Sequence, residues 1–255
     1  MPSPPRGYTT FPSDADLFYF CTTSSTSAED LGINYAPPSQ SSLRVGVVIL
    51  SQDQIQLTDL AAVDLLSTLS RSRIGKLSAP ASTLDEAVDE VDVRYVSVTG
   101  EGSFPVTSGA RMPVTQNSFA NTPQFDVLII PGSFSTKELS EAATSFLAAQ
   151  CSSPDLRAIF SISSGILHLT QTGLLWKRRA SAPRCLIPAL QQRYPETFWQ
   201  TKAWNRHDKI WTSSTAISAL DMIASWVREF FWDRHEAVEC ALAAAGIGSL
   251  DDFDY

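Results

Sequence analysis

The stretch "IFSISSGILHLTQTGLL", residues 159–175, decides the fold class. It opens with a short apolar run, continues through Ser163-Ser164-Gly165, and ends in a helical segment that stops at Gly173. This pattern predicts a buried strand that turns sharply into a helix. A serine on such a turn can be an exposed catalytic group, but it can equally be a simple helix cap.

The same alternation of strands and helices extends over most of the chain. It predicts an α/β fold with a mostly parallel central sheet sandwiched by helices. Two shorter features are a hairpin at 104–115 turning at Ser108-Gly109, and two strands within 198–214 turning at Asn205–Asp208. The predicted strands are 43–50, 91–98, 125–132 and 157–162, and the predicted helices are 58–71, 136–151, 164–173, 215–231 and 233–246.

Three regions are predicted: an N-terminal extension at 1–42, an α/β domain at 43–248 and a C-terminal tail at 249–255. The extension is rich in Ser, Thr and Pro, which is typical of a flexible leader. Its aromatic "DLFYF" segment, residues 16–20, favours the alternative that part of 14–38 packs on the core.

Composition narrows the range of partners. The net charge is -8 and the calculated pI is about 4.9, so we expect no nucleic-acid partner and no membrane partner. The N-terminus lacks the pattern of a signal peptide, which predicts a cytoplasmic protein with reduced thiols. The three histidines and four cysteines show no ligand spacing, so neither a metal site nor a cofactor is expected.

Polar residues follow three of the predicted strands. Asp59 and Asp64 follow the first, Gly132 and Ser133 follow the third, and the Ser163 turn follows the fourth. Sites in open α/β sheets lie at the carboxyl ends of strands, so these residues are candidates for one site. Asp59 can also be a helix cap.

Backbone amides at two of these turns are candidate anion donors. We predict that Gly132, Ser133, Ser164 and Gly165 bind substrate or an oxyanion. His168 lies five residues after Ser163 and is predicted to face elsewhere, as a packing residue.

Four stretches stand out when they are taken together: "RVGVVILSQDQIQLTDLAAVDLL", "FDVLIIPGSFSTKEL", "FSISSGILHLTQTGLLWKRRAS" and "IWTSSTAISALDMIASWV". They resemble the ThiJ/PfpI superfamily, most closely its isocyanide-hydratase-like and fungal ThiJ/PfpI-like branch. The resemblance implies a flavodoxin-like fold related to class I glutamine amidotransferases, and a homodimer, for which Trp199, Trp204 and Trp211 would supply apolar surface. It also implies metabolite tailoring in secondary metabolism.

The resemblance also assigns roles to positions, and this chain departs from it. Ser163 stands where relatives carry a reactive cysteine, and Pro183 stands at or near the place of a histidine. Asp59 best matches the aspartate that opens the first helix, although an ungapped register places Thr58 there and matches Asp64 to another acid. Cys185 is an alternative thiol, close in sequence but in the next segment.

A serine hydroxyl needs an adjacent base to act as a nucleophile, whereas a cysteine at such a turn can be a thiolate. We therefore predict a cofactor-independent lyase or isomerase that acts on a small molecule by acid–base chemistry, with Ser163, Asp59 and Asp64 as catalytic candidates. The alternatives are an inactive binding or regulatory protein and a serine hydrolase.

Overall fold

The computed structural model describes residues 42–50, 53–114, 118–133, 135 and 137–248, which belong to one compact unit beginning at Ser42. Residues 1–41 and 249–255 lie outside this description. The predicted packing of residues 14–38 and the predicted C-terminal tail therefore lie outside the described residues.

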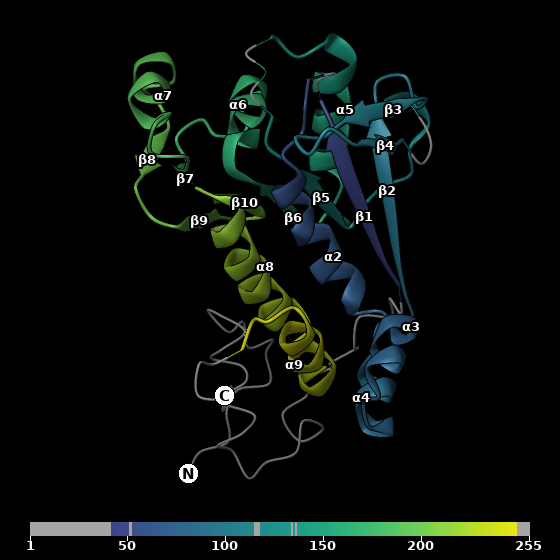
Figure 1. The fold of residues 1–255 in the computed structure, drawn as a ribbon. Coiled ribbons are helices and arrows are strands. Elements are labelled where there is room, and N and C mark those ends of the chain that lie inside the picture. Colours follow the sequence, from purple (N-terminus) through teal and green to yellow (C-terminus); the bar gives the residue numbers. More distant parts are fainter. Residues whose placement is uncertain (1–41, 51–52, 115–117, 134, 136, 249–255) are drawn as a thin grey trace, which may run out of the picture. The chain divides into compact units, whose positions relative to one another are not determined.

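A six-stranded sheet forms the centre of the described unit, in the order β2-β1-β5-β6-β10-β9 (Figure 1). All neighbouring pairs are parallel except β10 with β9, which are antiparallel. The mostly parallel sheet predicted from the sequence is thus confirmed. The strands are β1 (Ser42–Ile49), β2 (Glu90–Ser97), β5 (Val127–Ile130), β6 (Ala158–Ser161), β9 (Trp204–His207) and β10 (Ile210–Ser213).

Helices cover both faces of this sheet because the central strands are apolar on both sides. On one face, side chains such as Val47 and Phe160 pack with α2, α8 and α9. On the other face, Val48 and Leu128 pack with α5 and α6. The α-helices are α2 (Ala61–Thr68), α3 (Arg71–Ile74), α4 (Ala81–Glu86), α5 (Glu141–Ser152), α6 (Ile166–Leu169), α7 (Ile187–Arg193), α8 (Ala216–Phe230) and α9 (His235–Ala244).

Short 3-10 helices connect several elements. The predicted helix 58–71 consists of η1 (Leu57–Leu60) followed by α2, and the predicted helix 164–173 consists of η4 (Ser163–Gly165), α6 and η5 (Thr170–Thr172). It ends at Gly173 as predicted, with a left-handed φ of 74°. The others are η2 (Gly75–Leu77) and η3 (Phe119–Asn121). None of the helices in the described part of the chain is long and apolar enough to cross a membrane.

Two small sheets flank the central one. The predicted hairpin is confirmed as β3 (Ser103–Pro105) and β4 (Arg111–Pro113), with Gly109 in the turn at a φ of 81°. In contrast, β7 (Arg179–Ser181) and β8 (Phe198–Gln200) form a parallel pair that the sequence did not predict.

Two details of the 198–214 prediction were wrong. The turn between β9 and β10 is centred on Asp208 rather than on 205–208, and Asp208 adopts a left-handed φ of 54°. Trp211 is buried against Phe160 instead of supplying free surface, while Trp199 and Trp204 are half-buried. The exposed large aromatics among the described residues are Trp176 and Phe198.

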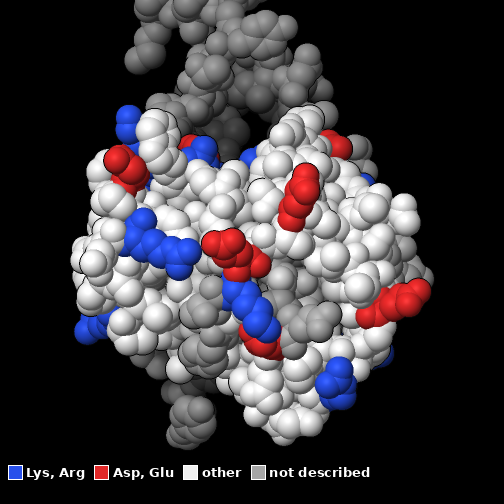
Figure 2. Space-filling model, turned by 90° about the horizontal axis from the view of Figure 1, so that it is seen from above, with Lys and Arg blue, Asp and Glu red and all other residues white. Residues whose placement is uncertain are grey.

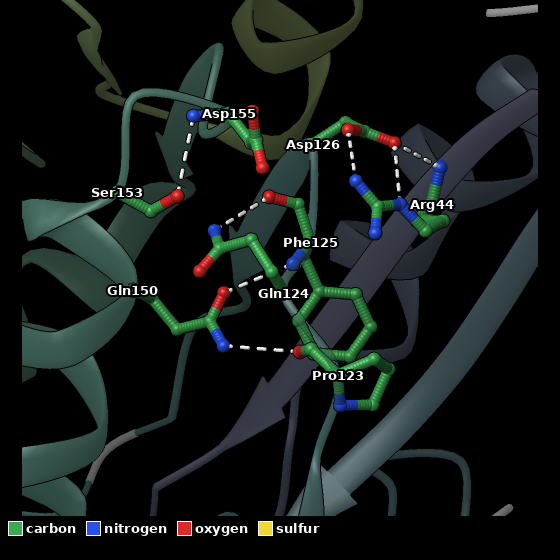
Figure 3. Close-up of polar contacts among 8 residues, drawn as sticks. All are labelled: Arg44, Pro123, Gln124, Phe125, Asp126, Gln150, Ser153 and Asp155. Atoms are coloured by element: carbon green, nitrogen blue, oxygen red, sulfur yellow. Dashed lines mark hydrogen bonds and ion pairs between the residues drawn. The ribbon is translucent and has the colours of Figure 1, made fainter.

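A polar cluster joins β1 to β5 at the opposite edge from their carboxyl ends (Figure 3). The buried carboxylate of Asp126 accepts hydrogen bonds from the backbone amide, Nε and Nη2 of Arg44, at 2.8, 3.1 and 2.8 Å. Gln150 of α5 accepts from the amide of Phe125 and donates to the carbonyl of Pro123. These bonds hold both strands in one register, which aligns the loops at their far ends.

Candidate active site

Ser163 occupies a sharp turn directly after the central strand β6. Its φ is +50°, a left-handed conformation that a residue with a side chain adopts at a cost of roughly 1 kcal/mol or more. The preceding residue is anchored by a hydrogen bond from the Ile162 amide to the Ile130 carbonyl, at 3.0 Å. Ser163 is half-buried, and the strained turn places it where a nucleophile elbow places its reactive group.

Gly165 makes this turn possible. A β-carbon at this position would lie 2.4 Å from the carbonyl oxygen of Ile130 and 3.0 Å from that of Pro131. Since no real side chain tolerates such distances, only glycine lets the start of the helix pack against the end of β5.

Asp59 reaches the end of β5 from the loop after β1. Ile55 forms an antiparallel bridge to Ser133, and the Gln56 amide donates to the Gly132 carbonyl at 2.9 Å. The η1 turn then directs the Asp59 carboxylate at the Gly132 amide, which donates to its Oδ2 at 2.6 Å. Asp59 is therefore not a helix cap, because its Oδ2 accepts a hydrogen bond from the Gly132 amide and not from an amide of its own helix.

The Asp59 carboxyl group is well suited to exchange a proton near neutral pH. It is only 1% exposed, and burial raises its pKa to about 6, against an opposing effect of the Gly132 hydrogen bond. Its second oxygen, Oδ1, is buried without a hydrogen-bond partner, and so is the Oγ of Ser164. Two unsatisfied buried oxygens in one small region are costly unless they serve a ligand or water.

Gly132 is the point where these groups converge. A β-carbon built on it would lie 2.5 Å from Asp59 Oδ2, 2.7 Å from Ser164 Oγ and 3.2 Å from Gln56 Oε1. The side chains of Gln56, Asp59 and Ser164 thus surround one small space beside the Gly132 α-carbon. We call these four residues the Gly132 cluster.

A second buried contact lies next to this cluster. Ser133 Oγ and His168 Nε2 share a hydrogen bond of 2.7 Å, and both residues are about 2% exposed. Burial lowers the pKa of His168, with a smaller opposing effect of the Asp53 charge, so the neutral ring is favoured. His168 lies four residues after Ser164, one helical turn, and its bond to Ser133 ties the elbow helix to the segment after β5 that also carries Gly132.

A cavity of about 840 Å³ lies along the carboxyl ends of β1 and β2, beside the β3–β4 hairpin, and does not enclose the elbow. Neither Ser163 nor a member of the Gly132 cluster lines it.

A sequence model of the DJ-1/PfpI family matches residues 74–229, which is more than half of the chain. The chain belongs to the DJ-1/PfpI family. The superfamily resemblance inferred from the sequence is therefore confirmed. No curated protein sequence matches the chain.

Solved structures agree on the fold of this DJ-1/PfpI chain. Drosophila melanogaster DJ-1beta is 15% identical with a TM-score of 0.60, covering 81% of this chain and 99% of its own. A DJ-1 superfamily protein from Salmonella typhimurium is 15% identical with a TM-score of 0.59, covering 79% and 97%. An AraC family transcriptional regulator from Pseudomonas putida is 17% identical with a TM-score of 0.55, covering 76% and 98%. At these identities the likeness concerns the fold alone.

Three catalytic candidates of this DJ-1/PfpI chain are not members of the Gly132 cluster: Asp64, Cys185 and Ser163. Asp64 is exposed on α2 and pairs with Arg73 at 3.6 Å, so the structure does not bring it to the elbow. Cys185 is exposed in the turn before α7, and Pro183, which stands near the position of the family's histidine, is half-buried after β7. The Ser163 hydroxyl forms no hydrogen bond with any of the described residues, and Asp59 is one of these residues.

Two of the predicted oxyanion donors already donate to protein acceptors. The Gly132 amide is already used by Asp59, and the Gly165 amide donates to the Ile162 carbonyl at 2.8 Å. Both residues therefore shape the site rather than offer a free donor. A role for Ser133 and Ser164 in binding substrate stays a prediction.

Sequence reasoning missed two neighbours of the site. Gln56 has no sequence signal, because its place depends on the bridge between Ile55 and Ser133. His168 lies five residues after Ser163, a spacing that predicts another helical face, but only four after Ser164, a spacing that predicts the same face. Its contact with Ser133 depends on the tertiary structure.

The raised pKa of Asp59 predicts a specific pH dependence of stability. The pKa of Asp59 is about 6 in the folded chain, above the ordinary value of 3.8. At pH values between these two, Asp59 therefore keeps its proton in the folded chain but has lost it in the unfolded chain. The contribution of Asp59 to the free energy of unfolding should therefore fall as pH rises from about 4 to about 6, by about 3 kcal/mol. Above pH about 6 it should stay constant.

Urea denaturation of the natural protein and of Asp59→Asn at several pH values measures this contribution, since the difference between them cancels other groups. We expect the variant to gain stability relative to the natural protein as pH rises through this window. A difference that stays constant from pH about 4 to about 7 would show that Asp59 has an ordinary pKa.

Proposed function

We propose that this chain is a cofactor-independent enzyme of the lyase or isomerase type, which acts by acid–base catalysis on a small organic molecule. The observation that carries this proposal is the buried Asp59 carboxyl group, with a pKa of about 6 and an unsatisfied Oδ1, beside the strained elbow. A proton-transfer group is most effective when its pKa lies near the working pH.

In this proposal the residues have separate roles. The Asp59 carboxylate removes a proton from an activated position of the substrate and returns it at another position, or to a departing hydroxyl group. The Gly132 amide holds Oδ2 and leaves Oδ1 to carry out the transfer. The hydroxyl of Ser163 orients the substrate by a hydrogen bond. These roles fit the isocyanide-hydratase-like branch, in which an aspartate opens the first helix, and metabolite tailoring is the activity we infer.

Serine-hydrolase chemistry has less support. A serine nucleophile needs a base in hydrogen-bond contact, and no such contact to Ser163 occurs in the described part of the chain. The nearest buried histidine in sequence, His168, is bonded to Ser133 instead. The His168 ring is neutral because its pKa is lowered, and its bond to Ser133 indicates that it holds the backbone in place rather than accepts a proton.

Untargeted metabolite profiling tests the proposal directly. A small-molecule extract is incubated with the natural protein or with Asp59→Asn. We expect a substrate and product pair that appears with the natural protein alone, with equal mass or with masses that differ by one water. Products that require cleavage of an ester or amide would favour the hydrolase alternative, and binding without conversion would favour a regulatory protein.

Ser163→Ala separates an orienting hydroxyl from a nucleophile. Loss of one neutral hydrogen bond should lower turnover about tenfold. An electrophilic phosphonate should leave Ser163 unlabelled, as judged by mass spectrometry of the intact protein. A nearly inactive Ser163→Ala variant together with a phosphonate adduct on Ser163 would establish a covalent mechanism instead.

A further inference from the structure

The 840 Å³ cavity beside the β3–β4 hairpin is separate from the Gly132 cluster and has the size of a small-molecule site. It lies at the carboxyl ends of β1 and β2, the edge of an open α/β sheet at which ligands bind. Figure 2 looks from above onto this edge, and basic and acidic side chains are interspersed there rather than gathered into one patch of either sign. Recognition by the cavity must therefore depend on individual groups.

Arg111 is the cationic group that the hairpin holds in place. Its Nε donates to Ser103 Oγ at 2.8 Å, and its Nη2 donates to the Ser103 carbonyl at 2.6 Å. No acidic side chain pairs with it in the described ranges 42–50, 53–114, 118–133, 135 and 137–248. The guanidinium is thus oriented by neutral acceptors and still carries donors for an anion.

An apolar wall lines the same cavity. Leu50 from the end of β1, Val98 from the end of β2, and Phe104 and Val114 from the hairpin region all contribute to it. Val98, a large apolar side chain directly after the edge strand β2, is 40% exposed. An apolar ligand body of ring size would cover this surface and gain free energy from its removal from water.

The other charged lining residues limit the charge of the ligand. Glu101 and Glu138 line the cavity, and neither has an ion-pair partner in the described part of the chain. Lys137, which also lines it, already pairs with Asp53 at 3.7 Å. A ligand can place one negative charge on Arg111, but a second negative charge on the ligand would be repelled by the carboxylates of Glu101 and Glu138.

We propose that this cavity binds a small amphipathic monocarboxylate, with its carboxylate on Arg111 and its apolar body against Leu50, Val98 and Phe104. The site is a second one, distinct from the elbow. It does not rest on the proposed acid–base chemistry, because no residue of the Gly132 cluster takes part in it.

Three probes that share one ring test the proposal by isothermal titration: phenylacetate, the neutral phenylacetamide and the dianion phenylmalonate. We expect phenylacetate to bind with a Kd of about 1 mM, the range for a ligand of this size. Phenylacetamide and phenylmalonate should bind at least about tenfold more weakly, because one lacks the charge and the other carries a second one.

Variants locate the binding. Arg111→Gln should weaken phenylacetate binding at least about tenfold, while Arg73→Gln, a matched change at an exposed arginine on α3, should leave it unchanged. Ser103→Ala removes the hydrogen bond from Arg111 Nε but keeps the charge and the bond to the backbone carbonyl, so it should have a smaller effect. Glu138→Gln should strengthen phenylmalonate binding.

Asp59→Asn should leave phenylacetate binding unchanged, which distinguishes this proposal from the acid–base one. Two outcomes of the binding measurements would overturn the proposal: equal binding of phenylacetamide and phenylacetate, or no binding of any probe at a concentration about ten times the expected Kd. It would also be overturned if the Arg111→Gln variant, with an unchanged melting temperature, bound phenylacetate as well as the natural protein does.

Discussion

Replacement of Asp59 by asparagine is expected to lower turnover about 10²–10⁴-fold, the usual contribution of a positioned proton-transfer group. The substitution removes the titrating proton but keeps the shape of the side chain. Its amide oxygen can still accept the hydrogen bond from the Gly132 amide, so the cluster should stay assembled. The variant should gain stability relative to the natural protein as pH rises to neutral, and equal melting temperatures would show that lost turnover does not come from unfolding.

The measurement is initial-rate kinetics on the substrate identified by profiling. Asp64→Asn is the matched control, since Asp64 is an exposed carboxylate that pairs with Arg73 outside the cluster. It should retain turnover within about twofold, as expected of an exposed surface group. The pH–rate profile of the natural enzyme should show an ionisation near pH 6, which the residual activity of Asp59→Asn should lack. Full activity of Asp59→Asn would refute the assignment.

Replacement of Gly132 by alanine is expected to lower turnover about 100-fold, the effect of displacing a catalytic group by roughly 1 Å. The φ of Gly132 is not in the positive range, so alanine can adopt the backbone conformation. The new methyl group would instead meet Asp59 Oδ2 at 2.5 Å and Ser164 Oγ at 2.7 Å, and one of them must move. The expected loss therefore comes from the geometry of the site.

Gly75→Ala is the control for this second variant. A β-carbon there would have Leu84 Cδ2 as its nearest neighbour at 3.7 Å, an ordinary contact, so turnover should be unchanged. NMR titration of the Asp59 carboxyl carbon provides an independent readout, because displacement into water should return its pKa toward 3.8. A Gly132→Ala enzyme with natural turnover and an unchanged Asp59 pKa would contradict the proposed arrangement.

Local sequence patterns predicted the main elements of the sheet but not all of their ends. Apolar runs identified β1, β5 and β6, because a strand buried on both faces must be apolar throughout. The β9–β10 turn was placed too early, since Asp208 adopts a left-handed conformation that glycine more often marks. The burial of Trp211 depends on Phe160 and on α8, which no local pattern reports.

The sequence by itself determined the α/β class and the strand–turn–helix at Ser163, and it offered Asp59 as the first catalytic carboxylate and Asp64 as the second. These features could be predicted because they depend on residues that are neighbours in the chain and on the conformations that their own side chains favour. Only the tertiary structure decided between the two aspartates. The bridge of Ile55 to Ser133 brings the Asp59 carboxylate to the Gly132 amide, while Asp64, five residues along, points to solvent. Burial, which raises the pKa of Asp59, arises from packing between segments 73 residues apart, so no reading of either segment alone could reveal it.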